Sequence, residues 1–213
     1  MKVLDLCSGL GGFSEAFLDD GHDVLRIEKN PLLADVDNTK IMCLFEFEDW
    51  LEEHYVNPQS MGSLLASSKF KSIDLIVFSP PCTEFSTAYS APRAIHHRGP
   101  SNDEYEPSME LLECGMRIIK MLKPKYWIVE NVRGSIKYFA EALGEPRQIN
   151  DAYVFWGNFP SFVPLPFPSK AKKDKRWSPL RANIRGKIPI EISNALLDAV
   201  NNQRSILDFV GEP

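Results

Sequence analysis

The sequence predicts an α/β protein built on a mostly parallel, doubly wound β-sheet. Short runs rich in β-branched and aromatic residues alternate along the chain with segments of helical spacing. A glycine-rich turn follows the first of these runs, as at a tight strand-to-helix connection. Strands that alternate with helices pair in parallel through right-handed crossovers, so helices are expected on both faces of the sheet.

The first strand is expected over residues 3–6, and residues 13–18 have the spacing of a helix. Gly21 ends that helix, because glycine accepts the left-handed conformation common at helix ends. Residues 23–28 predict a second strand. Asn30-Pro31 then opens another helix, since proline is favoured at the first helical position.

Two further strands are expected over residues 40–45 and 73–78, with a polar, loop-like segment at residues 57–72 between them. Pro80 and Pro81 stop the later strand, because each proline fixes its φ angle and lacks an N–H donor. The second half of the chain predicts an amphipathic helix at 107–122, strands at 126–129 and 152–156, an irregular connector at 159–169 and a helix at 192–201.

The composition fits one sizeable domain. The chain has 213 residues, 44% of them hydrophobic, and no run approaches the ~20 apolar residues of a membrane helix. The N-terminus does not resemble a signal peptide. The four cysteines form no Cys-x-x-Cys pair, so we expect free thiols in a reducing cytoplasm and no zinc site. His96-His97 has no third ligand at a natural spacing, so we expect no metal.

The charge is unevenly distributed. The chain carries a net charge of −5, but residues 170–187 contain eight basic residues and one acid. Such a cluster is typical of a phosphate-contacting surface. The alternative is a solvated loop, which is the commoner role of a charge run.

Cys82 and Glu130 follow two buried strands and are candidates for chemistry. A cysteine on a stiff turn at the carboxyl end of a strand lies where open α/β sheets bind ligands, and it can act as a nucleophile. A carboxyl group that is partly desolvated at such an edge has a raised pKa and can donate a proton. The alternatives are a small buried hydrophobe for Cys82 and a helix-capping or surface acid for Glu130.

A second pair of features points to a nucleoside-containing cofactor. Gly9, Gly11 and Gly12 lie between the first strand and the first helix, where glycine lets the backbone approach a ligand. Glu28 ends the second strand, and an acid there can accept hydrogen bonds from both ribose hydroxyls. Glycines that only build a tight turn are the alternative.

These motifs resemble those of the cytosine-5 DNA methyltransferase family. DLCSGLGGFSEAF near the start, SPPCTEFS in the middle and ENV after the fifth predicted strand occur in the family's order, over about residues 3–133. Near the C-terminus, Ile192-Ser193-Asn194-Ala195 is similar to the family's last motif. The resemblance implies a Rossmann-like S-adenosylmethionine-dependent methyltransferase fold. It also suggests a phage or restriction–modification enzyme in the cytoplasm of a bacterial, archaeal or phage-infected cell.

The resemblance implies residue roles. Cys82 would attack carbon 6 of cytosine in DNA, and Glu130 would supply a proton to the ring. The residues implied for S-adenosylmethionine are Cys7, Ser8, Gly9, Leu10, Gly11, Gly12, Phe13, Glu28, Lys29, Leu44, Pro80 and Asn194. Those implied for the nucleic acid are Pro81, Ser86, Arg93, Asn131, Lys172, Lys173 and Arg176, with residues 83–101 as a mobile lid.

The chain departs from the family pattern at four places. Thr83 replaces a glutamine, Cys43 takes the place of an acid near the adenine, and Asn150-Asp151-Ala152 replaces a Gln-x-Arg-x-Arg motif that helps to hold the target base. The target-recognition domain is also missing. We therefore expect a catalytic and cofactor-binding core at residues 1–157, a short basic, proline-rich region at 158–188 and a C-terminal helix at 189–213 that returns to the core.

So short a recognition region predicts weak or very short sequence specificity, because lysine and arginine in a loop contact phosphate but read few base edges. A monomer is expected. Three alternatives to a DNA methyltransferase stay open: an RNA methyltransferase of the transfer-RNA type, a catalytically impaired cofactor- or DNA-binding homologue, and a methylase of free cytidine nucleotide.

Overall fold

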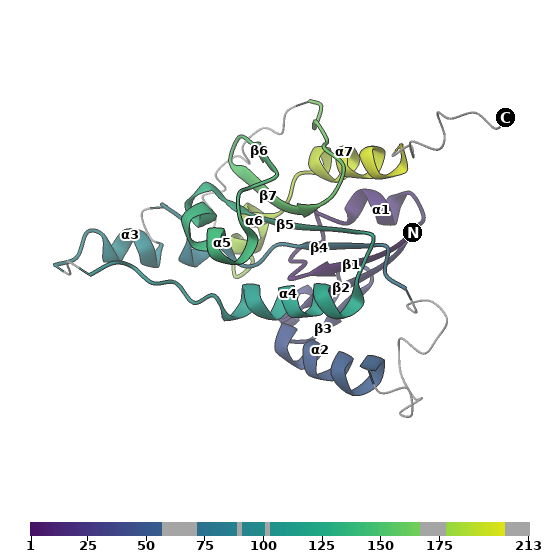
Figure 1. The fold of residues 1–213 in the computed structure, drawn as a ribbon, viewed down its shortest axis with the longest axis horizontal. Coiled ribbons are helices and arrows are strands. Elements are labelled where there is room, and N and C mark those ends of the chain that lie inside the picture. The colour runs from purple at the N-terminus through teal and green to yellow at the C-terminus, as the bar shows by residue number, and fades with distance from the viewer. Residues whose placement is uncertain (57–71, 89–90, 101–102, 167–177, 203–213) are drawn as a thin grey trace.

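The computed structural model describes residues 1–56, 72–88, 91–100, 103–166 and 178–202. Within these residues the chain forms one seven-stranded sheet with helices packed on both faces (Figure 1). Nearly all of the polar segment expected at 57–72 lies outside the described residues, as do Lys172, Lys173 and Arg176.

The sheet is mixed but mostly parallel, in the order β3-β2-β1-β4-β5-β7-β6. Its strands are β1 (Lys2–Leu6), β2 (Asp23–Glu28), β3 (Thr39–Ile41), β4 (Leu75–Phe78), β5 (Tyr126–Val132), β6 (Gln148–Asn150) and β7 (Tyr153–Asn158). The first five pair in parallel, whereas β7 runs antiparallel to both β5 and β6. The chain reverses its direction of growth between β1 and β4, so the predicted doubly wound α/β sheet is confirmed.

Seven α-helices are described: α1 (Glu15–Asp19), α2 (Leu44–Leu51), α3 (Pro92–His96), α4 (Glu110–Leu122), α5 (Ile136–Leu143), α6 (Arg181–Gly186) and α7 (Ile190–Asn201). Three 3₁₀ turns, η1 (Pro31–Leu33), η3 (Cys82–Glu84) and η4 (Arg133–Ser135), and one π-helical turn, η2 (Glu52–Val56), complete the elements. In Figure 1, α1 and α7 lie on one face of the sheet and α2 and α4 on the other.

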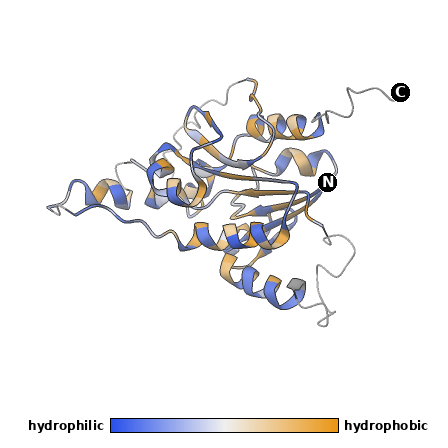
Figure 2. Cartoon of the chain, in the orientation of Figure 1, coloured by the Kyte–Doolittle hydropathy of each residue, from blue (hydrophilic) through white to orange (hydrophobic). Residues whose placement is uncertain are grey.

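Each face of the sheet has its own hydrophobic core. Val3 and Leu75 pack with residues of α1 and α7, whereas Leu4 and Ile76 pack with residues of α2 and α4. Successive residues of a strand point to opposite faces, so two apolar cores require strands that are apolar throughout. Figure 2 shows this pattern, with hydrophobic central strands and hydrophilic outer helix surfaces.

Several elements differ from the sequence predictions: β5 runs on to Val132, α4 begins at Glu110, and α2, α3, α5 and α6 were not expected. The third strand ends at Ile41 and not at residue 45, because Cys43 caps α2 and its N–H donates to the Glu46 side chain (2.9 Å). The helix expected after Asn30-Pro31 is the single turn η1. The expected strand at 152–156 is β7, which forms a hairpin with the unpredicted β6, a strand too short for a periodic pattern.

Candidate active site

The carboxyl ends of β1, β2, β4 and β5 meet at one edge of the sheet. Leu6 of β1 pairs with Ile27 of β2 and Phe78 of β4, and Phe78 in turn pairs with Val129 of β5. The next residues along these four strands are Cys7, Glu28, Ser79 and Glu130. The register of the sheet therefore brings the motifs of four separate segments together.

The glycine loop, residues 7–12, curls back onto the end of β2. Gly9 and Gly11 have φ angles of 54° and 72°, a region that favours glycine. The Gly9 N–H donates to Glu28 Oε2 (2.8 Å) and the Asn30 N–H donates to Oε1 (2.9 Å). These bonds fix the buried Glu28 carboxylate, and each oxygen has a second lone pair to offer a ligand hydroxyl.

A buried polar network supports the glycine loop. The Ser14 hydroxyl donates to Asp5 Oδ2 (2.6 Å), and Arg26 donates from Nε to Ser14 Oγ (2.9 Å) and from Nη2 to the Gly11 carbonyl (3.0 Å). Arg26 is only 3% exposed and Asp5 is fully buried. Burial raises the pKa of Asp5 to about 7, although Ser14 and Arg26 act in the opposite direction.

Gly12 has a different role in the same loop. A Cβ atom at this position would press into the Ile188 carbonyl oxygen and would lie 2.8 Å from Lys187 Cγ. The segment between α6 and α7 therefore lies directly against the glycine loop, and only a residue without a side chain fits between them.

The proline loop, residues 79–82, is held from the neighbouring strand. Asn131, at the end of β5, donates from Nδ2 to the Pro80 carbonyl (2.9 Å), and its Oδ1 accepts from the Val132 N–H (2.9 Å). Cys82 begins η3, and its carbonyl accepts from the N–H groups of Phe85 (3.1 Å) and Ser86 (2.9 Å). The Cys82 backbone is thus fixed on both sides.

A cavity of about 900 Å³ opens over these loops, and both candidate catalytic residues, Cys82 and Glu130, line it. Its volume is within the range of small-molecule and cofactor sites. Besides these two residues, it contains nine of the twelve residues implied for the cofactor, Cys7, Ser8, Gly9, Leu10, Phe13, Glu28, Lys29, Leu44 and Pro80, and Pro81 of those implied for the nucleic acid.

The two candidate catalytic groups have perturbed acidities. Burial raises the pKa of Glu130 to about 8, so its carboxyl group is mostly protonated at neutral pH. Burial also raises the pKa of the Cys82 thiol, and the charge of Glu130 raises it further. The positive charge of Arg185 acts on Cys82 in the opposite direction. A protonated acid beside a thiol is an arrangement suited to nucleophilic attack with proton transfer.

The remaining predicted site residues lie elsewhere. Gly11 and Gly12 pack against protein, not against the cavity. Asn194 is exposed on α7, and it is the neighbouring Ser193 that bonds to α1, donating to the Phe13 carbonyl (2.8 Å) and accepting from the Ala16 N–H (3.1 Å).

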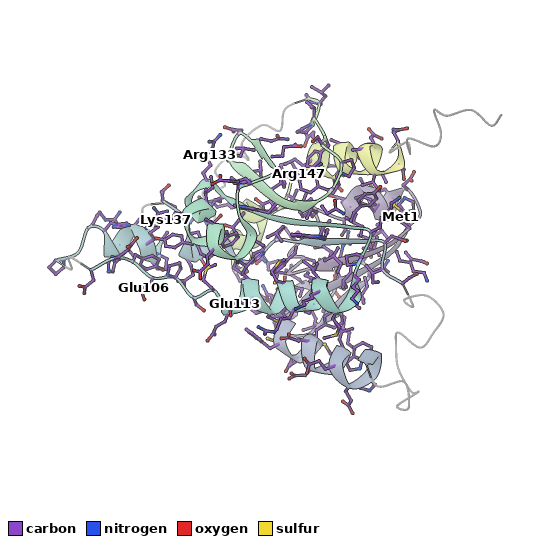
Figure 3. All side chains as sticks on the ribbon, in the orientation of Figure 1. Met1, Glu106, Glu113, Arg133, Lys137 and Arg147 are labelled. Atoms are coloured by element: carbon purple, nitrogen blue, oxygen red, sulfur yellow. The ribbon has the colours of Figure 1, made fainter. Side chains whose placement is uncertain are left out.

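Arg93 and Asn131 are occupied by scaffold contacts. Arg93 donates to the carbonyls of Phe85 (3.2 Å) and Gly134 (3.0 Å), and Asn131 is 99% covered beneath the proline loop. Ser86 lies outside the cavity, and its hydroxyl accepts from the Ala88 N–H (3.1 Å). The arginines nearest the altered base-holding motif, Arg133 and Arg147, are labelled in Figure 3. Both are engaged, since Arg133 donates to the Asp151 carbonyl (2.6 Å) and Arg147 lies over the Phe159 ring.

Sequence reasoning missed one wall of the cavity. Residues 182 to 188, on and after α6, contribute Ala182, Asn183, Arg185, Gly186, Lys187 and Ile188 to its lining. We expected this stretch to belong to the basic region outside the core. The signal that could have identified it is the change from the proline-rich connector to helix-compatible residues at 181–186.

The cavity fits S-adenosylmethionine, the cofactor that the sequence motifs imply. Ser8 Oγ is buried and has no hydrogen-bond partner among the described residues, so a ligand could satisfy it. Glu28 matches a ribose, and Leu44 with the 40% exposed Phe45 offers an apolar surface for a base. For a metal, by contrast, the described residues provide no group of three or more suitable ligands.

The family model for C-5 cytosine-specific DNA methylase matches residues 1–141, and the chain belongs to this family. The order and direction of the seven strands are those of a Rossmann-like α/β fold. None of the described helices is long and apolar enough to cross a membrane.

Individual relatives are similar over part of their length. Type II methyltransferase M1.HphI of Haemophilus parahaemolyticus is 27% identical over 153 residues, which are 69% of this chain and 36% of that protein. Type II methyltransferase M.DdeI of Desulfomicrobium norvegicum is 28% identical over 138 residues, 63% of this chain and 28% of that protein. The chain thus spans about a third of the length of these relatives. The solved S. pombe Dnmt2 methyltransferase aligns with a TM-score of 0.37 and 17% identity, over 83% of this chain and 57% of that one.

Proposed function

We propose that this protein transfers a methyl group from S-adenosylmethionine to carbon 5 of cytosine in DNA through a covalent adduct with Cys82. The observation that carries the proposal is one cavity that contains Cys82, Glu130, the glycine loop and Glu28. These residues lie in or after four different strands, and a structural role for any one of them would not require the other three to share a cavity.

Cys82 and Glu130 would act as a pair on the base. The Cys82 thiolate attacks carbon 6 of cytosine, and Glu130 gives its proton to the ring nitrogen, so no full negative charge develops on the ring. Carbon 5 becomes electron-rich and takes up the methyl group. Loss of the carbon 5 proton to solvent and cleavage of the sulfur–carbon bond restore the thiolate and the aromatic ring, and the ring nitrogen returns its proton to the Glu130 carboxylate. The raised pKa of Glu130, about 8, supports its role as the acid.

The cofactor would occupy the other part of the cavity. When bound, S-adenosylmethionine supplies an electrophilic methyl group. Glu28 would accept hydrogen bonds from its ribose, the Gly9 and Leu10 backbone would follow its methionine part, and Leu44 would cover its base. Because the Glu28 carboxylate is already held by two backbone N–H groups, it needs no rearrangement to bind.

We also propose how the chain divides these tasks. Residues 1–157 would form the catalytic and cofactor-binding core, and residues 189–213 would support it through α7. Residues 158–188 would take the place of a target-recognition domain, with the basic residues Lys172, Lys173 and Arg176 meeting phosphate. Sequence specificity would then be weak, since phosphate contacts position a protein without reading bases.

A methyl-transfer assay with labelled S-adenosylmethionine tests the proposal. Duplex DNA, single-stranded DNA, transfer RNA and free cytidine nucleotide are offered to the wild type and to Cys82→Ser. Transfer to DNA that Cys82→Ser abolishes is expected, together with a denaturation-resistant adduct on DNA containing fluorinated cytosine. Transfer only to RNA or to the nucleotide would replace the proposed substrate, and no transfer to any of them would indicate a catalytically impaired homologue.

A further inference from the structure

The turns that follow two of the strands at the site are in contact with each other. The turn η3 begins at Cys82, and η4 follows β5, the strand that contains Glu130. A Cβ atom on Gly134 of η4 would press into the carbonyl oxygen of Phe85, the residue directly after η3. The two turns therefore meet backbone to backbone, at a position where only a residue without a side chain fits.

Arg93, in the first turn of α3, bridges these two turns. Its Nη1 donates to both the Phe85 carbonyl (3.2 Å) and the Gly134 carbonyl (3.0 Å). The guanidinium group also lies over the Tyr138 ring of α5, with Cζ 5.5 Å from the ring centroid. Because hydrogen bonds from a charged donor are stronger than those between neutral groups, a single nitrogen atom ties the two turns together.

The Phe85 end of this bridge leads directly to the nucleophile. The N–H groups of Phe85 (3.1 Å) and Ser86 (2.9 Å) both donate to the Cys82 carbonyl. The Phe85 ring is buried and packs edge-on against the Phe139 ring of α5, with the two centroids 4.9 Å apart. A displacement of the Phe85 backbone would therefore move the backbone of Cys82 as well.

The Gly134 end of the bridge leads back to the acid. Glu130 lies in β5, and η4 begins directly after this strand. Arg93 thus connects the backbone segment of the candidate nucleophile with that of the candidate acid. In the proposed reaction Cys82 and Glu130 act on the same base, so the separation of their two segments has to be kept.

We propose that Arg93 is a positioning residue that fixes the turn beginning at Cys82 against the turn that follows Glu130. This role differs from the contact with nucleic acid that the sequence motifs imply for Arg93. For methyl transfer the inference rests on the proposed function. The bridge itself does not, because its hydrogen bonds form without cofactor or nucleic acid.

Amide hydrogen exchange tests the bridge directly, followed by mass spectrometry of a peptide that contains residues 82–86. The protein without cofactor or DNA is used, and the wild type is compared with Arg93→Ala and Arg93→Lys. Lys137→Ala is the matched control. Lys137, labelled in Figure 3, has its Nζ 4.5 Å from the centroid of the same Tyr138 ring, but its ion pair is with Glu104 (2.6 Å), outside both turns.

Arg93→Ala is expected to speed exchange in this peptide about tenfold, because the turn loses a charged donor that holds it in place. Lys137→Ala should exchange like the wild type. Arg93→Lys should lie between the two, since the lysine Nζ can also donate to two carbonyls but stands on a shorter side chain. Equal exchange in Arg93→Ala and the wild type would overturn the inference.

Methyl transfer and DNA binding distinguish positioning from a phosphate contact. With Arg93→Ala, kcat should fall by about tenfold to 10²-fold, while the Kd for duplex DNA and its salt dependence stay near those of the wild type. An unchanged kcat with weaker DNA binding and a salt slope lower by about one would make Arg93 a phosphate contact and overturn the inference. Faster exchange in a protein that methylates nothing would support the bridge and reject the proposed function instead.

Discussion

The glycine loop and the proline loop lie at the same edge of the sheet but are built by opposite means. In the glycine loop, the backbone takes left-handed turns at Gly9 and Gly11, and Arg26 donates a hydrogen bond to the Gly11 carbonyl. In the proline loop, two φ angles are fixed by proline rings, and Asn131 holds the Pro80 carbonyl from the side. One loop needs the absence of side chains, and the other needs stiffness.

The difference follows from what each loop presents to the cavity. The glycine loop exposes backbone that a ligand can approach closely, so side chains there would occupy the ligand's space. The proline loop presents one thiol, whose position must be accurate because a misplacement of about 1 Å can cost ~10²-fold in rate. Each loop also has a buried carboxyl group beside it. Asp5 is tied to Ser14 and Arg26, whereas Glu130 lines the cavity.

Glu130→Gln should have the largest effect. It tests the buried carboxyl group that lines the cavity, as opposed to Asp5, which supports the glycine loop. Glutamine can accept and donate hydrogen bonds but cannot deliver a proton, so methyl transfer should fall by roughly 10²–10⁴-fold. Steady-state rates with duplex DNA measure this loss. A rate within about threefold of the wild-type rate would show that Glu130 is not the acid.

The same variant should become more stable than the wild type as pH rises. Glu130 has a folded-state pKa of about 8, raised above its ordinary value, so the stability it contributes is complete at low pH and is lost as pH rises toward 8. Glutamine does not ionise, so Glu130→Gln should exceed the wild type in free energy of unfolding at about pH 8 but not at about pH 5. Urea unfolding at both pH values checks the sign, and an advantage that shrinks as pH rises would contradict it.

Gly12→Ala tests whether the glycine loop depends on close packing as well as on its turns. The added methyl group would press into the Ile188 backbone, so we expect a loss of about 2–3 kcal/mol in the free energy of unfolding. Gly186→Ala is the control, because a Cβ atom there has no atom within 4 Å. Thermal and urea unfolding of both variants measure the difference. Equal stability of the two would mean that the segment after α6 moves away at little cost.

Much of this site could be predicted because its residues belong to short local patterns. Glu28 ends β2, Cys82 follows β4, and Glu130 lies in β5 one residue beyond its last pair with β4. Parallel strands place their carboxyl ends at a common edge. The alternation of strands and helices therefore predicted a parallel sheet, and the common edge of that sheet predicted that Cys82, Glu130 and Glu28 lie near one another. The third strand was misjudged because Leu44 and Phe45 are apolar in either conformation, and the capping by Cys43 decides for a helix.

The rest depends on contacts that no local pattern contains. The approach of Ile188 to Gly12 joins positions far apart in the chain, so the sequence offered only the charge of this segment and not its destination. Asn194 matched a motif, but the helix turns that residue to solvent and buries Ser193. Asn131 also matched a motif, and its amide supports the loop that carries Cys82 without lining the cavity itself.

Asn131→Ala should give the smallest effect and tests how the proline loop is positioned. Losing the bond to the Pro80 carbonyl leaves a buried acceptor unpaired, at a cost of about 1–3 kcal/mol in stability. Because the loop carrying Cys82 becomes less constrained, kcat for methyl transfer should fall about tenfold while KM changes little.

Ser135→Ala is the matched control for this effect. Ser135, in η4 directly after β5, is also buried, and its hydroxyl donates to the Val132 carbonyl (2.7 Å) and not to the proline loop. It should lose similar stability and keep its kcat. If both variants lost activity in proportion to their stability, the bond to Pro80 would be a packing feature, and the two prolines alone would suffice to place the thiol.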